Sequence, residues 1–144
     1  MTVMTESVAR LLLPVSLVIA VAVLVKGYAD TGDGFTAGVI AALGVLLQYV
    51  VFPRPEVDRR LRGGHAATVA LGGLALALLV AFTPLLRGDA PLTHLPAPGA
   101  EAVHVGSLEL ITAVAFDVGI FALVLGASVT IVRLVAVSAG ERRS

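Results

Sequence analysis

GYADTGDGFTAGVIAALGVLLQYVVF, residues 27–52, carries the strongest structural signal in this chain. It begins as a polar, glycine-rich turn and continues as an apolar run that contains no basic residue. Gly32 and Gly34 can adopt left-handed backbone angles that other residues avoid, so we expect the chain to reverse tightly there. The apolar run over residues 35–52 then predicts a helix that crosses a membrane.

Small residues recur at every fourth position within this stretch and in two later segments. On a helix this spacing places them in one smooth strip that lets a neighbouring helix approach closely. The three strips are Gly34, Gly38 and Ala42; Gly73, Ala77 and Ala81; and Ala122, Gly126 and Thr130. Three strips are more than four helices need for their own packing. The pattern therefore predicts contacts with partner chains.

The composition supports an integral membrane protein. Hydrophobic residues make up 58% of the 144 positions and charged residues 14%, and the mean hydropathy is +0.99, which is too apolar for an ordinary soluble domain. The formal net charge is zero, which argues against a nucleic-acid partner. No cysteine is present, so disulfides and thiolate metal sites are excluded.

Four apolar segments predict an all-α fold, a single membrane domain over 1–144 with transmembrane helices at about 8–26, 35–52, 66–86 and 108–133. The first segment has an alternative, a cleaved signal peptide, because Arg10 precedes it and Ala20-Val21-Ala22 resembles a cleavage site. Three further apolar segments favour a retained first span. The charged segment 53–65 is expected to be a solvated loop between the second and third spans.

The distribution of basic residues predicts the orientation of the four spans. With the N-terminus inside, only Lys26 and Arg87 lie outside. The inside set is Arg10, Arg54, Arg59, Arg60, Arg62, Arg133, Arg142 and Arg143. Because cytoplasmic loops are enriched in Lys and Arg, both termini are predicted to be cytoplasmic.

Two acidic residues lie in the fourth predicted span. Ser107 is expected to cap this helix and Arg133 to close it. Glu109 would then lie in the first turn, where the helix dipole stabilises a carboxylate, with a place in an ion path as the alternative. Asp117, ten residues after Ser107, would lie about 15 Å along the helix from it, near the middle of the bilayer, and should face protein or water because of its cost in lipid. It is a candidate for an ion or proton path, or a hydrogen-bonded anchor between helices.

Other polar residues carry weaker signals. Gln48 is interpreted as an interfacial residue that bonds to lipid headgroups or backbone, with contact to a transported ion as the alternative. His94 and His104 are ten residues apart with only Glu101 nearby, which is poor spacing for a metal site. The chain contains no recognisable nucleophile–base pair, phosphate-binding loop or metal motif, so we predict no catalytic residue, no metal site and no cofactor. An enzyme acting alone is therefore not expected.

The opening turn resembles a known signature. The B subunit of Mrp-type multisubunit Na+/H+ antiporters, the MnhB-like family, carries a sequence of roughly G-H-x-x-P-G-G-G-F-x-x-G after its first membrane helix. The matching positions here are Gly27, Gly32, Gly34, Phe35 and Gly38, whereas Tyr28, Thr31 and Asp33 stand for His, Pro and Gly. These departures remove the imidazole and the proline and keep the glycine spacing. The four apolar segments also resemble that family.

The resemblance implies a small subunit of an antiporter in a prokaryotic cell membrane. Its partners would be the other subunits and membrane lipid, and the transported ions would be Na+ and H+. The large subunits of such complexes are thought to carry proton pumping, and the small ones to complete the sodium route. Two alternatives stay open: a structural or assembly protein in which Asp117 only holds helices together, and a small subunit of a redox-driven ion pump such as a membrane-bound hydrogenase.

Overall fold

The computed structural model describes residues 2–26, 32–88 and 102–141, which are helical over most of their length. The helices are α1 (Val3–Lys26), α2 (Asp33–Val51), α3 (Arg54–Leu61), α4 (Ala66–Phe82) and α5 (Ala102–Glu141), with 3-10 turns η1 (Gly63–His65) and η2 (Pro84–Arg87). Four segments within these ranges are long and apolar enough to cross a membrane: Val3–Lys26, Asp33–Val51, Gly63–Leu86 and Ile111–Gly140. The predicted all-α fold with four such helices is confirmed.

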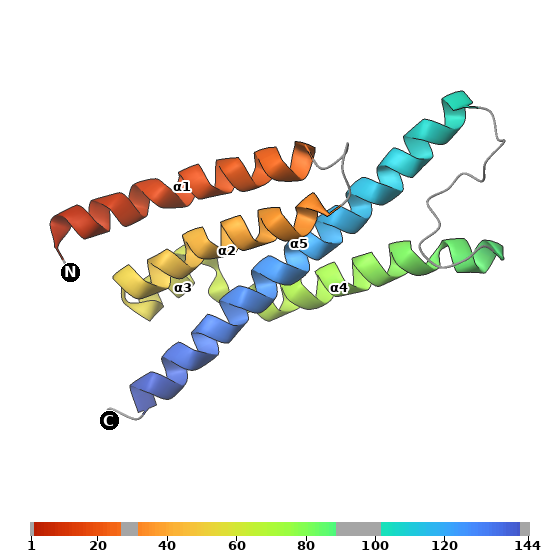
Figure 1. The fold of residues 1–144 in the computed structure, drawn as a ribbon. Coiled ribbons are helices and arrows are strands. Elements are labelled where there is room, and N and C mark those ends of the chain that lie inside the picture. Colours follow the sequence, from red (N-terminus) through yellow and green to blue (C-terminus); the bar gives the residue numbers. More distant parts are fainter. Residues whose placement is uncertain (1, 27–31, 89–101, 142–144) are drawn as a thin grey trace.

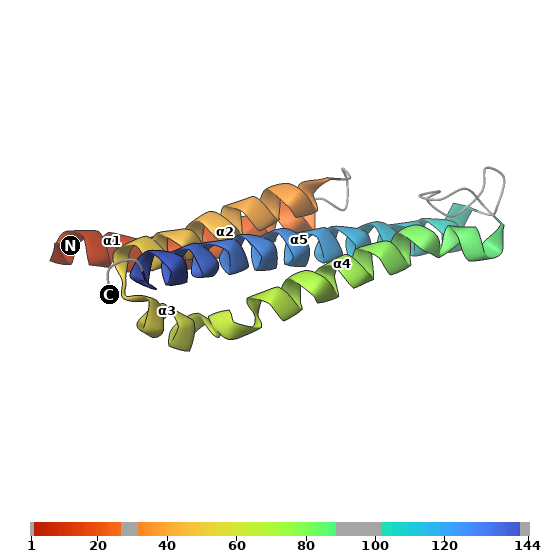
Figure 2. The same cartoon turned by 90° about the horizontal axis from the view of Figure 1, so that it is seen from below.

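The long helices pack side by side in the order α1, α2, α5, α4 (Figure 1). α5 therefore lies between α2 and α4, although it is last in the chain. The amino-terminal end of α1, the carboxyl-terminal end of α5 and the short helix α3 all lie at one end of the molecule (Figure 2). That end is referred to below as the terminal end, and the other as the far end.

Glycines bring α4 and α5 into backbone contact. A Cβ atom placed on Gly73 would lie 2.8 Å from the Cβ of Ala122, and one on Gly119 would lie 2.9 Å from the backbone nitrogen of Ala77. One on Gly126 would lie 2.9 Å from the Cα of Ala70. Real Cβ contacts are longer than these, so only glycine allows this helix pair to pack so closely.

Glycines also bring α2 and α5 into close contact. A Cβ on Gly34 would lie 2.8 Å from the Cα of Asp117, and one on Gly38 would lie 2.9 Å from the Cβ of Val124. Ala42, the third member of the strip, is also buried. These two helices run in the same direction, because the contacts advance together along both of them.

The small-residue strips are therefore used largely within the chain itself. Gly34, Gly38, Gly73 and Gly126 all face another helix of the same protein. The prediction that the strips exceed the chain's own needs, and so mark contacts with partner chains, is wrong for these positions. It failed because the sequence does not show that α5 packs between two helices and needs close approach on both sides.

The ends of two helices differ from the sequence prediction. α5 begins at Ala102, so Ser107 lies inside the helix and does not cap it, and Glu109 is not in the first turn. α5 also continues beyond Arg133 to Glu141. α4 ends at Phe82, ahead of the predicted 86, because Pro84 lacks the N–H that would continue the helix.

The charged segment after α2 is also more structured than predicted. Pro53 lies just before α3 at its N-cap position, and Pro55 lies in the first turn, where proline suits a helix. Val57 is 2% exposed and joins a cluster with Ala9, Val51 and Phe52. The segment therefore begins as a helix and not as a loop, and α3 packs one side against α1 and α2. Its charged side chains stay at least partly exposed, as expected of a solvated face.

Candidate functional site

Asp117 is buried between α5 and the beginning of α2, with 4% of its surface exposed. Its backbone touches Gly34, and its carboxyl group receives hydrogen bonding from the backbone of Gly32 and Gly34. Asp33, between these two glycines, adds a second negative charge nearby. Asp117 faces protein, as the cost of a carboxylate in lipid requires.

Local sequence explains this arrangement. Gly32 has φ of 112°, a backbone conformation that side chains rarely adopt, and it precedes the first residue of α2. The expected left-handed turn is therefore present at Gly32. Gly34, expected to share that conformation, is helical, and its lack of a side chain serves the approach of α5. The first N–H groups of a helix lack partners and carry partial positive charge, which suits a carboxylate.

The level of Asp117 differs from the prediction. It lies beside the first turn of α2, near one end of that span and not at its middle. The predicted position near the bilayer midplane was counted from Ser107 as the start of the helix. Because α5 is 40 residues long, or about 60 Å, it extends well beyond one membrane thickness, and that count does not apply.

The remaining residues of the signature differ in their surroundings. Gly38 packs against α5, whereas Phe35 is 58% exposed on the surface of this chain. Gly27, Tyr28 and Thr31 lie outside the described residues. Glu109 is on α5, and its side chain also lies outside the described part. The structure therefore brings Asp117 together with Gly32 and Gly34, and not with Phe35.

A second carboxylate, at the terminal end, is held quite differently. Asp58 on α3 accepts hydrogen bonds from the Tyr49 hydroxyl at 2.7 Å and from Arg133 Nε at 2.8 Å and Nη2 at 3.2 Å. Arg54 Nε lies 3.3 Å from Oδ2 of Asp58, the oxygen that also accepts the bond from Arg133 Nη2. Gly63 sits against Tyr49 and Asp58, where a Cβ would have no room. This cluster ties α2, α3 and α5 together.

The partners of Asp58 decide its protonation. Partial burial acts to raise its pKa, but the hydrogen bonds from Arg133 and Tyr49 and the positive charges of Arg133 and Arg54 act the other way. The net effect is to lower the pKa of Asp58 below its ordinary value. Asp58 is therefore ionised throughout the neutral range and acts as a fixed anion that joins three helices.

The sequence prediction did not single out Asp58, and it placed Arg133 at the end of a helix. In the structure α5 continues past Arg133, whose side chain reaches α3. One signal was present: Arg54 and Asp58 are four residues apart, the spacing of an ion pair on one helix face. The partner 75 residues away has no such local signal.

Gln48 is expected from the sequence to bond either to lipid headgroups or to backbone, and in the structure it bonds to backbone. Its Nε2 donates a hydrogen bond of 2.7 Å to the backbone oxygen of Ala9, and the side chain is buried. This hydrogen bond joins α1 to α2. Within the described ranges no group of three or more histidine, aspartate and glutamate side chains gathers as metal ligands would.

Known proteins resemble this chain over most of its length. The chain is similar to the B subunit of the Na(+)/H(+) antiporter of Alkalihalophilus pseudofirmus (29% identical over 134 residues, 93% of this chain and 92% of that protein). It is also similar to the protein of the same name from Bacillus subtilis (30% identical over 110 residues, 76% of both chains). A third relative is the A/B subunit of a probable K(+)/H(+) antiporter of Rhizobium meliloti (33% identical over 132 residues), where the match covers 85% of this chain and 12% of that longer protein.

One protein family also matches this chain. It is a domain related to the MnhB subunit of the Na+/H+ antiporter, and the match extends over residues 4–130. That range contains nearly all of α1, all of α2, α3 and α4, most of α5, the glycine turn and Asp117. Since the match covers most of the 144 residues and agrees with the resemblance at the glycine signature, this chain belongs to the MnhB family.

Proposed function

We propose that this chain is a small membrane subunit of a multisubunit antiporter that exchanges a monovalent cation for protons across the cell membrane. The observation that carries the proposal is the family match over residues 4–130, which includes most of all four helices able to span a membrane. The relatives named as B subunits of an Na+/H+ antiporter support the same function. Because one relative is named for K+ and two for Na+, both cations are candidates.

The fold suits a component of a complex better than a carrier acting alone. Secondary transporters usually alternate access by moving one repeat against another around broken helices. Here α5 is continuous from Ala102 to Glu141 and is in backbone contact with both α2 and α4. Such close packing favours a rigid element that supports an ion route shared with other subunits, and those subunits are the proposed partners together with lipid.

Within this function, Asp117 is the residue through which we propose that this chain takes part in the ion or proton path. Two features support it: the side chain is buried, and its neighbours in the described part are backbone groups and the carboxylate of Asp33, with no Lys or Arg in an ion pair. A carboxylate that is not neutralised by a fixed cation can accept a proton or a metal cation. Glu109, eight positions earlier on α5, stays a second candidate.

We also propose that the terminal end faces the cytoplasm. The positive-inside rule supports this orientation, because α3 and its arginines lie at that end. The amino-terminal end of α1 and the carboxyl-terminal end of α5 lie there too (Figure 2). The chain has no cysteine, so single cysteines can report the side directly. Thr2→Cys should be shielded from an impermeant maleimide in intact cells, and Gly88→Cys should react; the reverse pattern would contradict the orientation.

Omission of this one chain tests the function. The complete set of subunits encoded with this chain would be expressed in cells that lack their own antiporters, beside the same set without this chain and this chain alone. Proton release from inverted vesicles would be recorded after addition of Na+ or K+. Exchange should require the complete set. Robust exchange by this chain alone, or unchanged exchange in its absence, would refute the proposal.

A further inference from the structure

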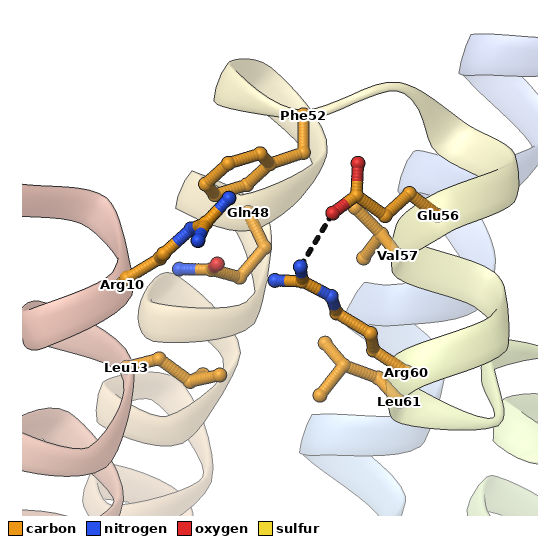
Figure 3. Close-up of a pocket in the computed structure, with 8 residues that line it drawn as sticks. All are labelled: Arg10, Leu13, Gln48, Phe52, Glu56, Val57, Arg60 and Leu61. Carbon is orange, nitrogen blue, oxygen red and sulfur yellow. Dashed lines mark ion pairs between the residues drawn. The ribbon is translucent and has the colours of Figure 1, made fainter. Parts of the chain in front are cut away.

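A cavity with both charged and apolar walls, called the polar cavity below, opens between α1, α2 and α3 at the terminal end (Figure 3). Its volume is about 300 Å³, and its walls include Arg10 from α1, Gln48 and Phe52 from α2, and Arg60 from α3. The guanidinium carbons of Arg10 and Arg60 lie 5.2 Å and 5.7 Å from the centre of the Phe52 ring. One aromatic ring thus holds two arginines beside the same space.

The charges around this cavity do not balance. Glu56 forms an ion pair of 2.6 Å with Arg60, whereas Arg10 has no ion pair among the described residues. The two arginines and one glutamate leave one positive charge in excess. Arg60 also keeps further N–H donors, because a guanidinium has five. An anion between the two arginines would relieve their repulsion and use these donors.

An apolar cavity adjoins the polar one. It has a volume of about 450 Å³, and its walls are mostly apolar, with Leu17, Val45, Leu61, Val69, Leu125 and Val129 among them; Arg62 and His65 also line it. Leu61 lines both cavities, and on α1 the lining passes from Leu13 to Leu17 in the next turn of the helix. The polar cavity is at the terminal end, and the apolar one lies further along α1, towards the middle of the membrane span.

This succession of positive charge and apolar surface matches one kind of molecule. An anionic phospholipid carries its phosphate at the membrane surface and its acyl chains directly beneath. α3 is charged and lies at the end of α2, where the surface of the membrane is expected, and basic residues at this level attract anionic lipids. We propose that the two cavities bind one anionic phospholipid, with its phosphate between Arg10 and Arg60 and an acyl chain along Leu17, Val69 and Leu125.

Lipid binding to the full-length chain in mild detergent, followed by native mass spectrometry, tests the proposal. The probes are phosphatidylglycerol, phosphatidylcholine with the same acyl chains, and glycerol 3-phosphate, which has the phosphate and no chains. Phosphatidylglycerol should bind at least about fivefold more tightly than phosphatidylcholine. High salt should reduce that difference, because it screens charges at the membrane surface. Glycerol 3-phosphate should bind far more weakly than either lipid.

Variants separate the two halves of the site. Arg10→Gln and Arg60→Gln should each weaken phosphatidylglycerol binding about fivefold, the effect expected of one basic residue near an anionic lipid. Arg59→Gln, on the same helix but outside the cavity, is the matched control and should change little. Glu56→Gln should strengthen binding, because it removes the anion that competes for Arg60.

The apolar half is tested at exposed positions, so that the fold is preserved. Val69→Trp would fill the apolar cavity and should weaken binding of both lipids, whereas Leu71→Trp lies outside that cavity and should not. Equal affinity for the two lipids, or the same affinity in Arg10→Gln, Arg60→Gln and Arg59→Gln, would overturn the proposal. Binding of glycerol 3-phosphate as tight as that of phosphatidylglycerol would show a site for free phosphate compounds and would also overturn it.

Discussion

Two carboxylates of this protein, Asp58 and Asp117, lie at opposite ends of α2 and are held in opposite ways. Asp58, near the end of α2, is bound by the side chains of Tyr49 and Arg133, with Arg54 close by. Asp117, at the beginning of α2, meets the backbone of two glycines and the carboxylate of Asp33. Both acids join α5 to another helix, but among the described residues only Asp58 is paired with arginines.

This difference is the basis of the roles proposed for the two acids, a structural one for Asp58 and a place in the ion or proton path for Asp117. A carboxylate paired with arginine stays ionised, and removal of its charge leaves the arginine without a partner. A carboxylate at a helix N-terminus can lose its charge and keep its hydrogen bonds, because the N–H donors need only an oxygen. Substitutions at the two ends of α2 should therefore differ in their effect on stability, and they are taken below in order of decreasing effect.

Gly34→Leu should have the largest effect, a loss of about 3 kcal/mol or failure to fold, because any side chain there collides with the backbone of Asp117. Thermal unfolding and size-exclusion profiles in mild detergent would measure it. Gly72→Leu is the matched control, since nothing lies within 4 Å of a Cβ at that glycine. Equal stability of the two variants would mean that α2 and α5 do not make this contact.

Asp58→Ala should cost about 1 to 3 kcal/mol, because Arg133 and the Tyr49 hydroxyl lose their acceptor. Solvent screens part of the attraction between Asp58 and its arginines, because the side chain of Asp58 is 22% exposed, and this lowers the expected loss of stability. On the same helix, Glu56→Gln removes only a more exposed ion pair and should cost less than about 1 kcal/mol. Thermal unfolding of both variants gives the comparison, and a larger loss in Glu56→Gln would contradict it.

The stabilisation by Asp58 should disappear in acid. Its pKa in the folded protein is below the ordinary value of 3.8, so its contribution is complete above that pH and is lost as the pH falls through the folded pKa. The wild type should therefore be more stable than Asp58→Asn at neutral pH, and the difference should shrink only below about pH 3.8. Unfolding curves at a series of pH values test this, and a difference that already falls well above that pH would be inconsistent with it.

Asp117→Asn should have the smallest effect on stability, less than about 1 kcal/mol, because asparagine still accepts hydrogen bonds from α2 and loses only the attraction of the helix dipole. The complex should assemble, but exchange in inverted vesicles should be lost or shifted in its pH dependence. Asp117→Glu should keep some exchange, and Asp117→Leu should impair assembly.

The outcome for Asp117→Asn also decides between the two roles of this residue. Normal exchange at every pH in a fully assembled complex would remove Asp117 from the ion path. It would then be a helix anchor, which is the role that Asp58 has at the other end. In that case both acids would hold helices together, and they would differ only in how much each stabilises the fold.

Several features could be predicted from residues close together in the chain. Four long apolar runs require helices, because backbone groups in lipid must find their partners within the segment. The reversal at Gly32 could be predicted because only glycine accepts its φ of 112° at little cost. The family signature depends on the same local spacing, and the family is confirmed by the match over residues 4–130.

Other features depend on which helices become neighbours. The sequence alone determined a four-helix membrane protein of the MnhB family with a glycine turn and an acid, Asp117, inside its last span. Only the tertiary structure decided that α5 packs between α2 and α4, that the small-residue strips are used within the chain, and that Asp58 pairs with Arg133, 75 residues away. Helix periodicity shows which residues share a face, but the choice of neighbour for that face depends on the packing of all the helices together, which no local pattern contains.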